Sequence, residues 1–204
     1  MVDHDTLKAS LCRALSRQRH STSDFDLHPD IVLPEDRVLR DAGVLIGIRP
    51  RPEGAVVVLT KRSSALKHHP GQIAFPGGKV DAGDDGVIGA ALREAEEEIG
   101  LPRDAVEILG TLPPHETVTR FLATPVLGLI TREVAYQPEL GEVAEVFEVP
   151  LDHLLDPANF SVQSRRWRGH RRAYFTVPWG PYYIWGATAR MLRALADRMS
   201  DDPT

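Results

Sequence analysis

Apolar residues recur along the chain at helical spacing in three places. Between residues 87 and 99 they stand three and four positions apart, which predicts one buried stripe of an α-helix. A first helix is expected to be capped by Asp5 or Thr6, and a last helix to lie near the C-terminus. The expected buried positions are, in order, Leu7, Leu11 and Leu15; Ile88, Ala91, Leu92, Ala95 and Ile99; and Thr188, Met191, Leu192, Leu195 and Met199.

Runs of aliphatic and β-branched residues predict strands. The runs are 40–48, 55–60, 73–75, 106–112, 121–130, 146–150, 170–177 and 182–184. A Pro-Arg-Pro-Glu-Gly turn should join the first two as a hairpin, and their near-continuous apolar character predicts a sheet covered on both faces. Pro125 lacks an amide hydrogen, so we expect an edge or a bulge in that strand. A second hairpin should form around Pro178–Pro181.

Strands mixed with at least three helices predict an α/β fold in layers, with a mixed β-sheet between helices. The 204 residues, 42% of them hydrophobic, suit one domain with a substantial core. We therefore expect a single domain over 1–204. Residues 1–36 should supply an N-terminal helix and a surface linker, and 37–200 the catalytic core.

Composition limits the compartment and the partners. The formal net charge of −5 gives no electrostatic reason to expect a nucleic-acid partner. No apolar run approaches the about 20 residues that cross a bilayer, so we expect no membrane partner. The single cysteine, Cys12, fits a reducing cytoplasm, and its apolar helical setting predicts a packed thiol. A homodimer is compatible with the sequence but is not required by it.

The helix at 87–99 carries a second stripe, made of Glu94, Glu97 and Glu98. Three carboxylates at this spacing repel one another unless a positive group lies among them. A divalent metal would meet that need, and an oxygen-only ligand set suits Mg²⁺ or Mn²⁺. A solvated acidic face is the alternative, but it would also have to explain Arg93 beside the cluster and Gly77-Gly78 ahead of it.

Residues 93–101, Arg-Glu-Ala-Glu-Glu-Glu-Ile-Gly-Leu, match the second half of the Nudix hydrolase signature, and Gly78 matches its opening glycine. The chain thus resembles that family. It departs from the pattern in two ways: Asp84 stands where Glu is usual, and eight residues rather than seven separate it from Arg93. Residues 59–63 and 66–76 resemble the extra signature of the coenzyme A pyrophosphatase branch, which also carries the longer loop with Asp.

This resemblance implies the Nudix fold and metal-dependent hydrolysis of the pyrophosphate bond of coenzyme A (CoA) or acyl-CoA. The products would be 3′,5′-ADP and 4′-phosphopantetheine or its acyl derivative. One alternative is a Nudix hydrolase of another nucleoside diphosphate derivative, such as ADP-ribose or a dinucleotide. A nucleotide-sensing module without catalysis is a further alternative, but no expected carboxylate is missing here.

The resemblance also implies roles for single residues. Glu94, Glu97 and Glu98 are the expected metal ligands, joined by the carbonyl of Gly78. Arg93 is expected to orient carboxylates with its planar fork, and Asp81 and Asp84 to brace the loop. The general base is Glu94 or a carboxylate from a later loop. The later candidates are Glu116, Glu139, Glu142 and Glu145, and Glu142 is included among the expected catalytic residues.

A basic cluster precedes the signature and is expected to attract the phosphates of the substrate. The expected substrate-binding residues are Lys61, Arg62, Lys67, His69 and Gln72. Adjacent histidines at 68 and 69 lack the spaced partners of a zinc site. A second basic run, 165–172, is interpreted as a solvated hairpin or an anion contact.

Overall fold

The computed structural model describes residues 4–17, 20–34, 36–66, 69–167 and 170–200. Its main sheet contains β1 (Thr22–Ser23), β2 (Arg40–Arg49), β3 (Val56–Arg62), β4 (Ile73–Ala74), β5 (Gly77–Lys79), β6 (Val106–Thr111), β7 (His115–Glu116), β8 (Phe121–Ile130) and β9 (Val143–Pro150). A separate hairpin contains β10 (Ser161–Trp167) and β11 (His170–Thr176). The helices are α1 (His4–Ser16), α2 (Gly86–Ile99), α3 (Leu151–Leu155) and α4 (Ala187–Met199), with short 3₁₀ turns at Arg103–Ala105 and Pro157–Asn159.

The sheet is built around β2 and β8, which run parallel from the pair Arg40–Phe121 to the pair Ile48–Leu129. On the other side of β2, β5 and β3 pair antiparallel with its two ends. The strand β9 extends the sheet beyond β3, while β6 and β7 follow one another along the outer side of β8. The sheet is therefore mixed, as the sequence predicted.

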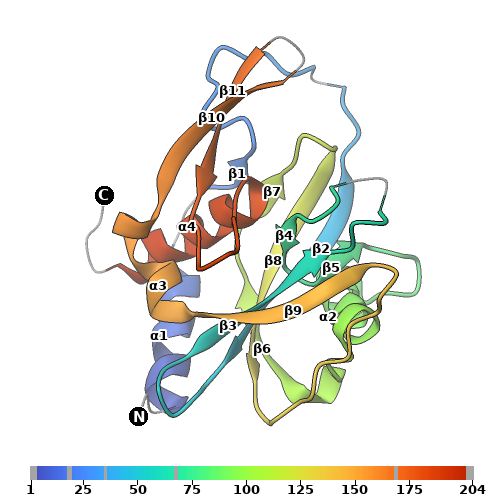
Figure 1. Ribbon diagram of the computed structural model, residues 1–204, viewed down its shortest axis with the longest axis vertical. Coiled ribbons are helices and arrows are strands. Elements are labelled where there is room, and N and C mark those ends of the chain that lie inside the picture. The colour runs from blue at the N-terminus through green and yellow to red at the C-terminus, as the bar shows by residue number, and fades with distance from the viewer. Residues whose placement is uncertain (1–3, 18–19, 35, 67–68, 168–169, 201–204) are drawn as a thin grey trace.

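Helices cover both faces of this sheet. Side chains along each strand point alternately to the two faces, and each face therefore has its own buried core. One core joins Leu59, Phe147 and their neighbours to α1, α3 and α4. The other joins Val58, Val143 and Val146 to the apolar stripe of α2. Figure 1 shows α2 on one side of the sheet and α1 with α4 on the other. The prediction of a layered α/β fold is confirmed.

The expectation for Pro125 was wrong in part. The strand β8 lies inside the sheet, with β2 on one side and β6 and β7 on the other. The carbonyl of Pro125 accepts a hydrogen bond from the amide of Leu112, so Pro125 N also faces the junction between β6 and β7. The amide hydrogen that Pro125 lacks would therefore not have bonded to β2, and the ladder between β8 and β2 loses no hydrogen bond. The ladder is irregular between Ile108 and Gly110 of β6 instead.

Other differences lie near the chain ends. The linker 20–36 contains β1, which pairs with β7, and α1 begins at His4, so Asp5 and Thr6 lie inside the helix rather than capping it. The thiol of Cys12 is exposed, because the buried stripe of α1 is confined to Leu7, Leu11 and Ala14. The prediction of a packed thiol was wrong. Among the described residues, no helix combines the length and apolar character that a membrane crossing requires.

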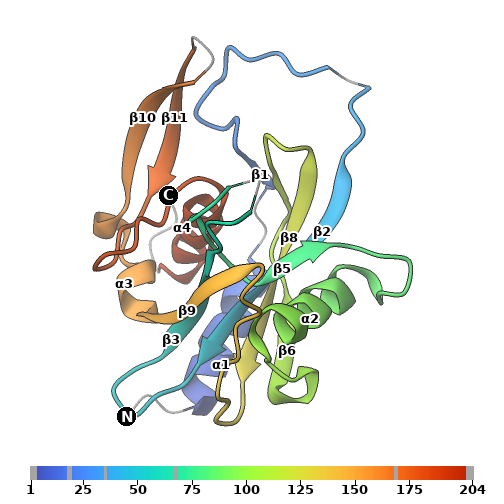
Figure 2. The same ribbon diagram turned by 45° about the vertical axis from the view of Figure 1, so that its right-hand side comes forward.

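The predicted hairpin around Pro178–Pro181 forms only in part. The strand β11 forms its ladder with β10, from Ser161–Thr176 to Trp167–His170. Residues 182–185 return beside the end of β11 through the antiparallel bridges Trp179–Tyr182 and Thr176–Trp185 and through a bond from the amide of Val177 to Ile184 O at 2.9 Å. Figure 2 shows the β10–β11 hairpin rising beside α4, apart from the main sheet. The basic run 165–172 thus belongs to a hairpin, as one of its two interpretations stated.

Candidate active site

The glycine loop and the acidic helix are held together by the sheet. The strand β5, Gly77–Lys79, pairs with Ala42, Gly43 and Val44 of β2. The helix α2 follows after a turn and ends at Gly100, whose φ of 65° is left-handed and whose amide donates to Glu96 O at 3.0 Å. The signature therefore begins in the sheet and ends in the helix that covers one face of it.

Arg93 connects the loop to the helix. Its Nε and Nη2 donate to the two oxygens of Asp84 at 2.9 and 3.1 Å, and Nη2 also donates to Lys79 O at 3.1 Å. Its Nη1 donates to Glu94 at 3.0 Å and to Glu97 at 2.9 Å. Asp84 in turn accepts the amide of Asp81 at 2.8 Å. The orienting role expected for Arg93 and the bracing role expected for Asp84 match these contacts.

Two carboxylates lie directly over the glycine loop. A Cβ atom added to Gly78 would stand 2.3 Å from Glu94 Oε1, so only glycine leaves room for this carboxylate. Glu98 is buried, and one of its oxygens accepts the amide of Gly77 at 3.2 Å. Glu97 lies farther out, with 59% of its side chain exposed. The structure therefore brings Glu94 and Glu98 together above Gly77-Gly78.

Burial makes these two carboxylates costly to ionise. It raises the pKa of Glu98 to about 7, and the nearby charge of Glu94 adds to this shift. Burial also raises the pKa of Glu94, against the lowering effect of Arg93. By contrast, the hydrogen bonds from Arg93 and from the amide of Asp81 lower the pKa of Asp84. Asp84 is thus a stable anion paired with Arg93, whereas Glu94 and Glu98 lie where added positive charge is favourable.

The donor atoms of these residues suit a divalent cation, although the residues do not form a complete ligand set. The donors are all oxygens, and the Glu94 carboxylate can lie over Gly78 because a side chain is absent there. Among the described residues, no three His, Cys, Asp or Glu side chains converge as a ready ligand set. The reason is visible in the contacts, since Arg93 takes one oxygen of Glu94 and one of Glu97.

The carboxylates considered as the base differ in their surroundings. Glu116 pairs with Arg37, Glu145 accepts the hydroxyl of Tyr182, and Glu139 accepts the amide of Glu142 at 2.9 Å. Glu142 is exposed, in the turn before β9, and its charge contributes to the raised pKa of both Glu94 and Glu98. Glu142 and Glu139 therefore both lie beside the acidic helix, since the amide of Glu139 donates to Glu98 O at 2.9 Å.

The basic cluster is only partly brought to this site. The amide of Arg62 donates to Gln72 O at 2.9 Å, which closes the loop between them, and the positive charge of Arg62 acts on Glu98. Lys61 is exposed and pairs across the sheet with Glu145, on the face that carries Phe147. Neighbours in a strand point to opposite faces, so Lys61 and Arg62 diverge. His69 is exposed, and Lys67 lies outside the described residues.

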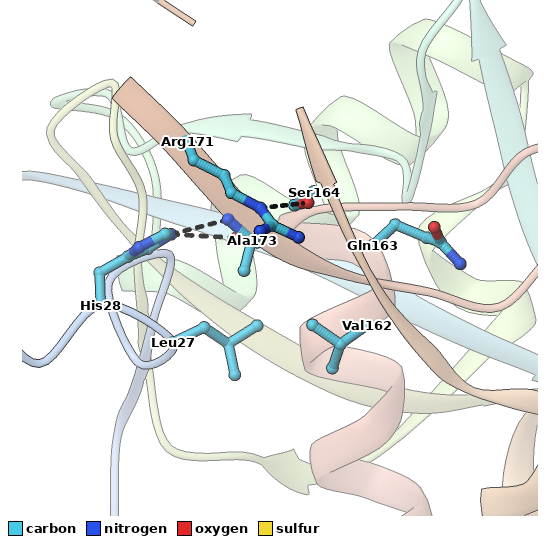
Figure 3. Close-up of a pocket in the computed structure, with 7 residues that line it drawn as sticks. All are labelled: Leu27, His28, Val162, Gln163, Ser164, Arg171 and Ala173. Carbon is cyan, nitrogen blue, oxygen red and sulfur yellow. Dashed lines mark hydrogen bonds between the residues drawn. The ribbon is translucent and has the colours of Figure 1, made fainter. Parts of the chain in front are cut away.

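A separate hollow lies between the linker and the β10–β11 hairpin (Figure 3). Its lining residues are Leu27, His28, Val162, Gln163, Ser164, Arg171 and Ala173. The ring of His28 contacts both backbone polar atoms of Ala173 at 3.1 Å, and Arg171 donates to Ser164 at 2.8 Å. None of the expected site residues lines this hollow. Its contacts instead attach the linker to β11.

One contact of a candidate base had no sequence signal. The hydroxyl of Tyr182 donates to Glu145, although the two stand 37 positions apart in the chain. Sequence patterns placed Tyr182 only at the start of the expected strand 182–184, because a contact of this kind leaves no local period.

Comparison with known proteins agrees with this arrangement. Residues 39–169 match the NUDIX domain family. The chain is 43% identical over 164 residues to a protein of Enterobacter sp. (strain 638) named "Uncharacterized Nudix hydrolase NudL", covering 80% of this chain and 85% of that protein. A protein of the same name from Salmonella heidelberg is 39% identical, with 90% of this chain and 95% of that protein covered.

A solved structure shares the fold at lower identity. The NUDIX domain of Shewanella oneidensis NrtR, crystallised with ADP ribose, superposes with a TM-score of 0.52 at 16% identity. The match covers 80% of this chain and 90% of that chain. This likeness concerns the fold alone.

Proposed function

The chain belongs to the Nudix family of hydrolases, and on that premise we propose that it is a metal-dependent pyrophosphatase of CoA and acyl-CoA. The reaction would release 3′,5′-ADP and 4′-phosphopantetheine or its acyl derivative. The observation that carries this proposal is the pair formed by Asp84 and Arg93. Asp is one methylene shorter than Glu, the loop is one residue longer than the general signature, and the carboxylate still meets the guanidinium with both oxygens.

The protein residues divide the work of this reaction. Glu94, Glu97 and Glu98, with the carbonyl of Gly78, would hold Mg²⁺ or Mn²⁺. When bound, such an ion neutralises charge on the phosphoryl oxygens and lowers the pKa of water. Arg93 keeps Glu94 and Glu97 oriented through its Nη1 contacts. The carboxylate of Glu142 would accept the proton of the attacking water.

The basic residues would bind the substrate phosphates. Arg62 and Gln72 border the same closed loop, and Arg62 lies on the α2 side, near Glu98. Lys67 and His69 would extend this positive surface toward the 3′-phosphate of CoA, whereas Lys61 points to the opposite face of β3. The local charge is needed because the whole chain is net negative at −5.

A panel of substrates tests the proposal. CoA, acetyl-CoA, ADP-ribose and a dinucleotide are each incubated with Mg²⁺ or Mn²⁺, and the products are separated by chromatography. We expect CoA and acetyl-CoA to yield 3′,5′-ADP. Cleavage of ADP-ribose with no cleavage of either CoA compound would instead support the second Nudix activity. A sensing module would bind ligand without metal-dependent turnover in the wild type, and its ligand response would survive Glu97→Gln.

A further inference from the structure

The segment 177–186 joins β11 to α4 and packs against β9 on the face opposite α2. Trp179 and Tyr182 close a tight turn, in which the amide of each donates to the carbonyl of the other at 3.0 and 2.9 Å. Just after the segment, Thr188 Oγ1 of α4 donates to Ile73 O at 3.0 Å. The segment is thus fixed at two points, and it presents Tyr182 to β9.

Tyr182 makes two contacts with β9. Its ring lies flat on Phe147, with ring centroids 3.6 Å apart and an interplanar angle of 8°. Its hydroxyl donates to the carboxylate of Glu145. Because Phe147 belongs to the buried core, stacking on it fixes the position of the Tyr182 ring and the direction of the Tyr182 hydroxyl.

The strand β9 is irregular where Tyr182 holds it. Lys61 pairs with Glu145, but the next residue, Arg62, pairs with Val143. Ala144 is therefore an extra residue in β9, and such a bulge redirects the chain beside it. Glu142 stands two residues before Ala144, and Glu145 directly after it. A second bond, from the amide of Ser63 to Glu142 O at 2.8 Å, holds the other side.

The turn that carries Glu142 also contacts the acidic helix. The amide of Glu139 donates to Glu98 O at 2.9 Å, and the amide of Val143 donates to Glu139 O at 2.7 Å. Glu142 therefore lies between a backbone contact with α2 and the start of β9. The contact of Tyr182 with Glu145 holds the β9 side of this turn.

We propose that Tyr182 is a positioning residue: by holding Glu145, it fixes the bulged start of β9 and so keeps the Glu142 carboxylate beside the acidic helix. This inference rests on the proposed function, because it takes Glu142 as the base. Tyr182 itself touches no expected metal ligand in the structure.

The variant Tyr182→Phe keeps the stacked ring and removes only the hydroxyl. Its matched control is Tyr183→Phe, since the neighbouring hydroxyl contacts Tyr174 at 3.3 Å, away from Glu145. With the best substrate of the panel, we expect kcat to fall about tenfold in Tyr182→Phe while KM changes less than about twofold. Tyr183→Phe should match the wild type in both. Equal kcat values for Tyr182→Phe and the wild type would overturn the proposal.

Substitutions at Glu145 provide an independent route if Tyr182→Phe folds poorly. Glu145→Gln retains an oxygen that accepts the tyrosine hydroxyl, so kcat should stay within about threefold of the wild type. Glu145→Ala removes the acceptor and should lower kcat about tenfold. An equal loss in both variants would show that the charge of Glu145, rather than its bond to Tyr182, matters, and would contradict the positioning role.

Hydrogen exchange separates this inference from the choice of substrate. Peptides that cover residues 139–147 are followed by mass spectrometry in the protein without substrate. We expect faster exchange in Tyr182→Phe than in Tyr183→Phe or the wild type. Unchanged exchange would overturn the positioning role even if CoA is confirmed as substrate. If no CoA compound is cleaved, the proposed function fails, while the exchange comparison still decides whether Tyr182 fixes this turn.

Discussion

The guanidinium of Arg93 holds the carboxylate of Asp84 through two hydrogen bonds, from Nε to Oδ1 at 2.9 Å and from Nη2 to Oδ2 at 3.1 Å. The same group donates through Nη1 to Glu94 and Glu97. One side chain thus connects the loop before α2 to two of its carboxylates. The geometry explains how the departures from the general signature fit together, since a shorter acid on a longer loop still reaches the arginine.

Arg93→Lys should disable the site, because a lysine cannot reproduce the planar fork that spans Asp84, Glu94 and Glu97. We expect kcat to fall by about 10- to 100-fold, with the fold retained. Steady-state kinetics and circular dichroism measure both. The control is Arg103→Lys, because Arg103 pairs with Glu96 at 2.9 Å in an ordinary surface contact, with about half of each side chain exposed. Similar losses in the two variants would argue against a special role for Arg93.

Gly78→Ala should weaken metal binding, because the new Cβ would lie 2.3 Å from Glu94 Oε1 and displace that carboxylate. We expect the Kd for Mn²⁺ to rise about tenfold or more, measured by calorimetry. Gly83→Ala on the same loop is the matched control, because nothing lies within 4 Å of its added Cβ. An unchanged Kd in Gly78→Ala would remove Glu94 from the metal site.

The pH dependence of stability should reveal Glu98 in the metal-free protein. Its pKa is about 7 when folded and 4.5 in the reference state. Between these values the unfolded chain releases a proton that the folded protein retains, so stability falls as pH rises. The free energy of unfolding that Glu98 loses as pH rises should amount to roughly 3 kcal/mol, and this loss should be complete above pH 7.

Glu98→Gln isolates this contribution, because the amide cannot ionise. In urea titrations with a chelator, we expect the variant to gain stability over the wild type as pH rises from 5 to 8. Saturating Mn²⁺ should reduce that gain, since the cation stabilises the ionised wild-type carboxylate. A difference between the two proteins that does not vary with pH would contradict the buried carboxyl.

Glu142→Gln should slow the chemical step without loosening the metal. As general base, Glu142 should contribute about 100-fold or more to kcat. The Mn²⁺ affinity should stay near that of the wild type. Glu53→Gln, in the exposed turn between β2 and β3, serves as the control. If Glu142→Gln retains full kcat, the base must be one of the other candidates from the sequence, which are Glu94, Glu116, Glu139 and Glu145.

Local patterns predicted the parts of the fold that depend on local periods. The stripe of α2 and its stop at Gly100 are both found as expected. Pro125 misled because the penalty for a proline depends on the neighbouring strand, and here its nitrogen faces the β6–β7 junction. The strand β10 carries exposed polar and basic residues, so it lacks the apolar alternation that marks a half-buried strand.

The residues of the candidate site also fall into those that the local sequence predicts and those that only the structure brings together. Glu94, Glu97, Glu98 and Arg93 were found together because one helix and one motif contain them. The comparison of Glu116, Glu139, Glu142 and Glu145 required the structure, because the contacts of Glu116 and Glu145 join them to residues far away in the chain. The split between Lys61 and Arg62 also required it, since only the pairing of β3 with β9 shows which face each occupies.

The most direct test of the central claim is the ratio of kcat/KM for CoA to kcat/KM for ADP-ribose, measured with the same Mg²⁺ concentration and with product identification. We expect CoA to be favoured by at least about tenfold, with 3′,5′-ADP as a product and with turnover lost in Glu97→Gln. A ratio below one, or turnover of CoA that survives Glu97→Gln, would contradict the assignment.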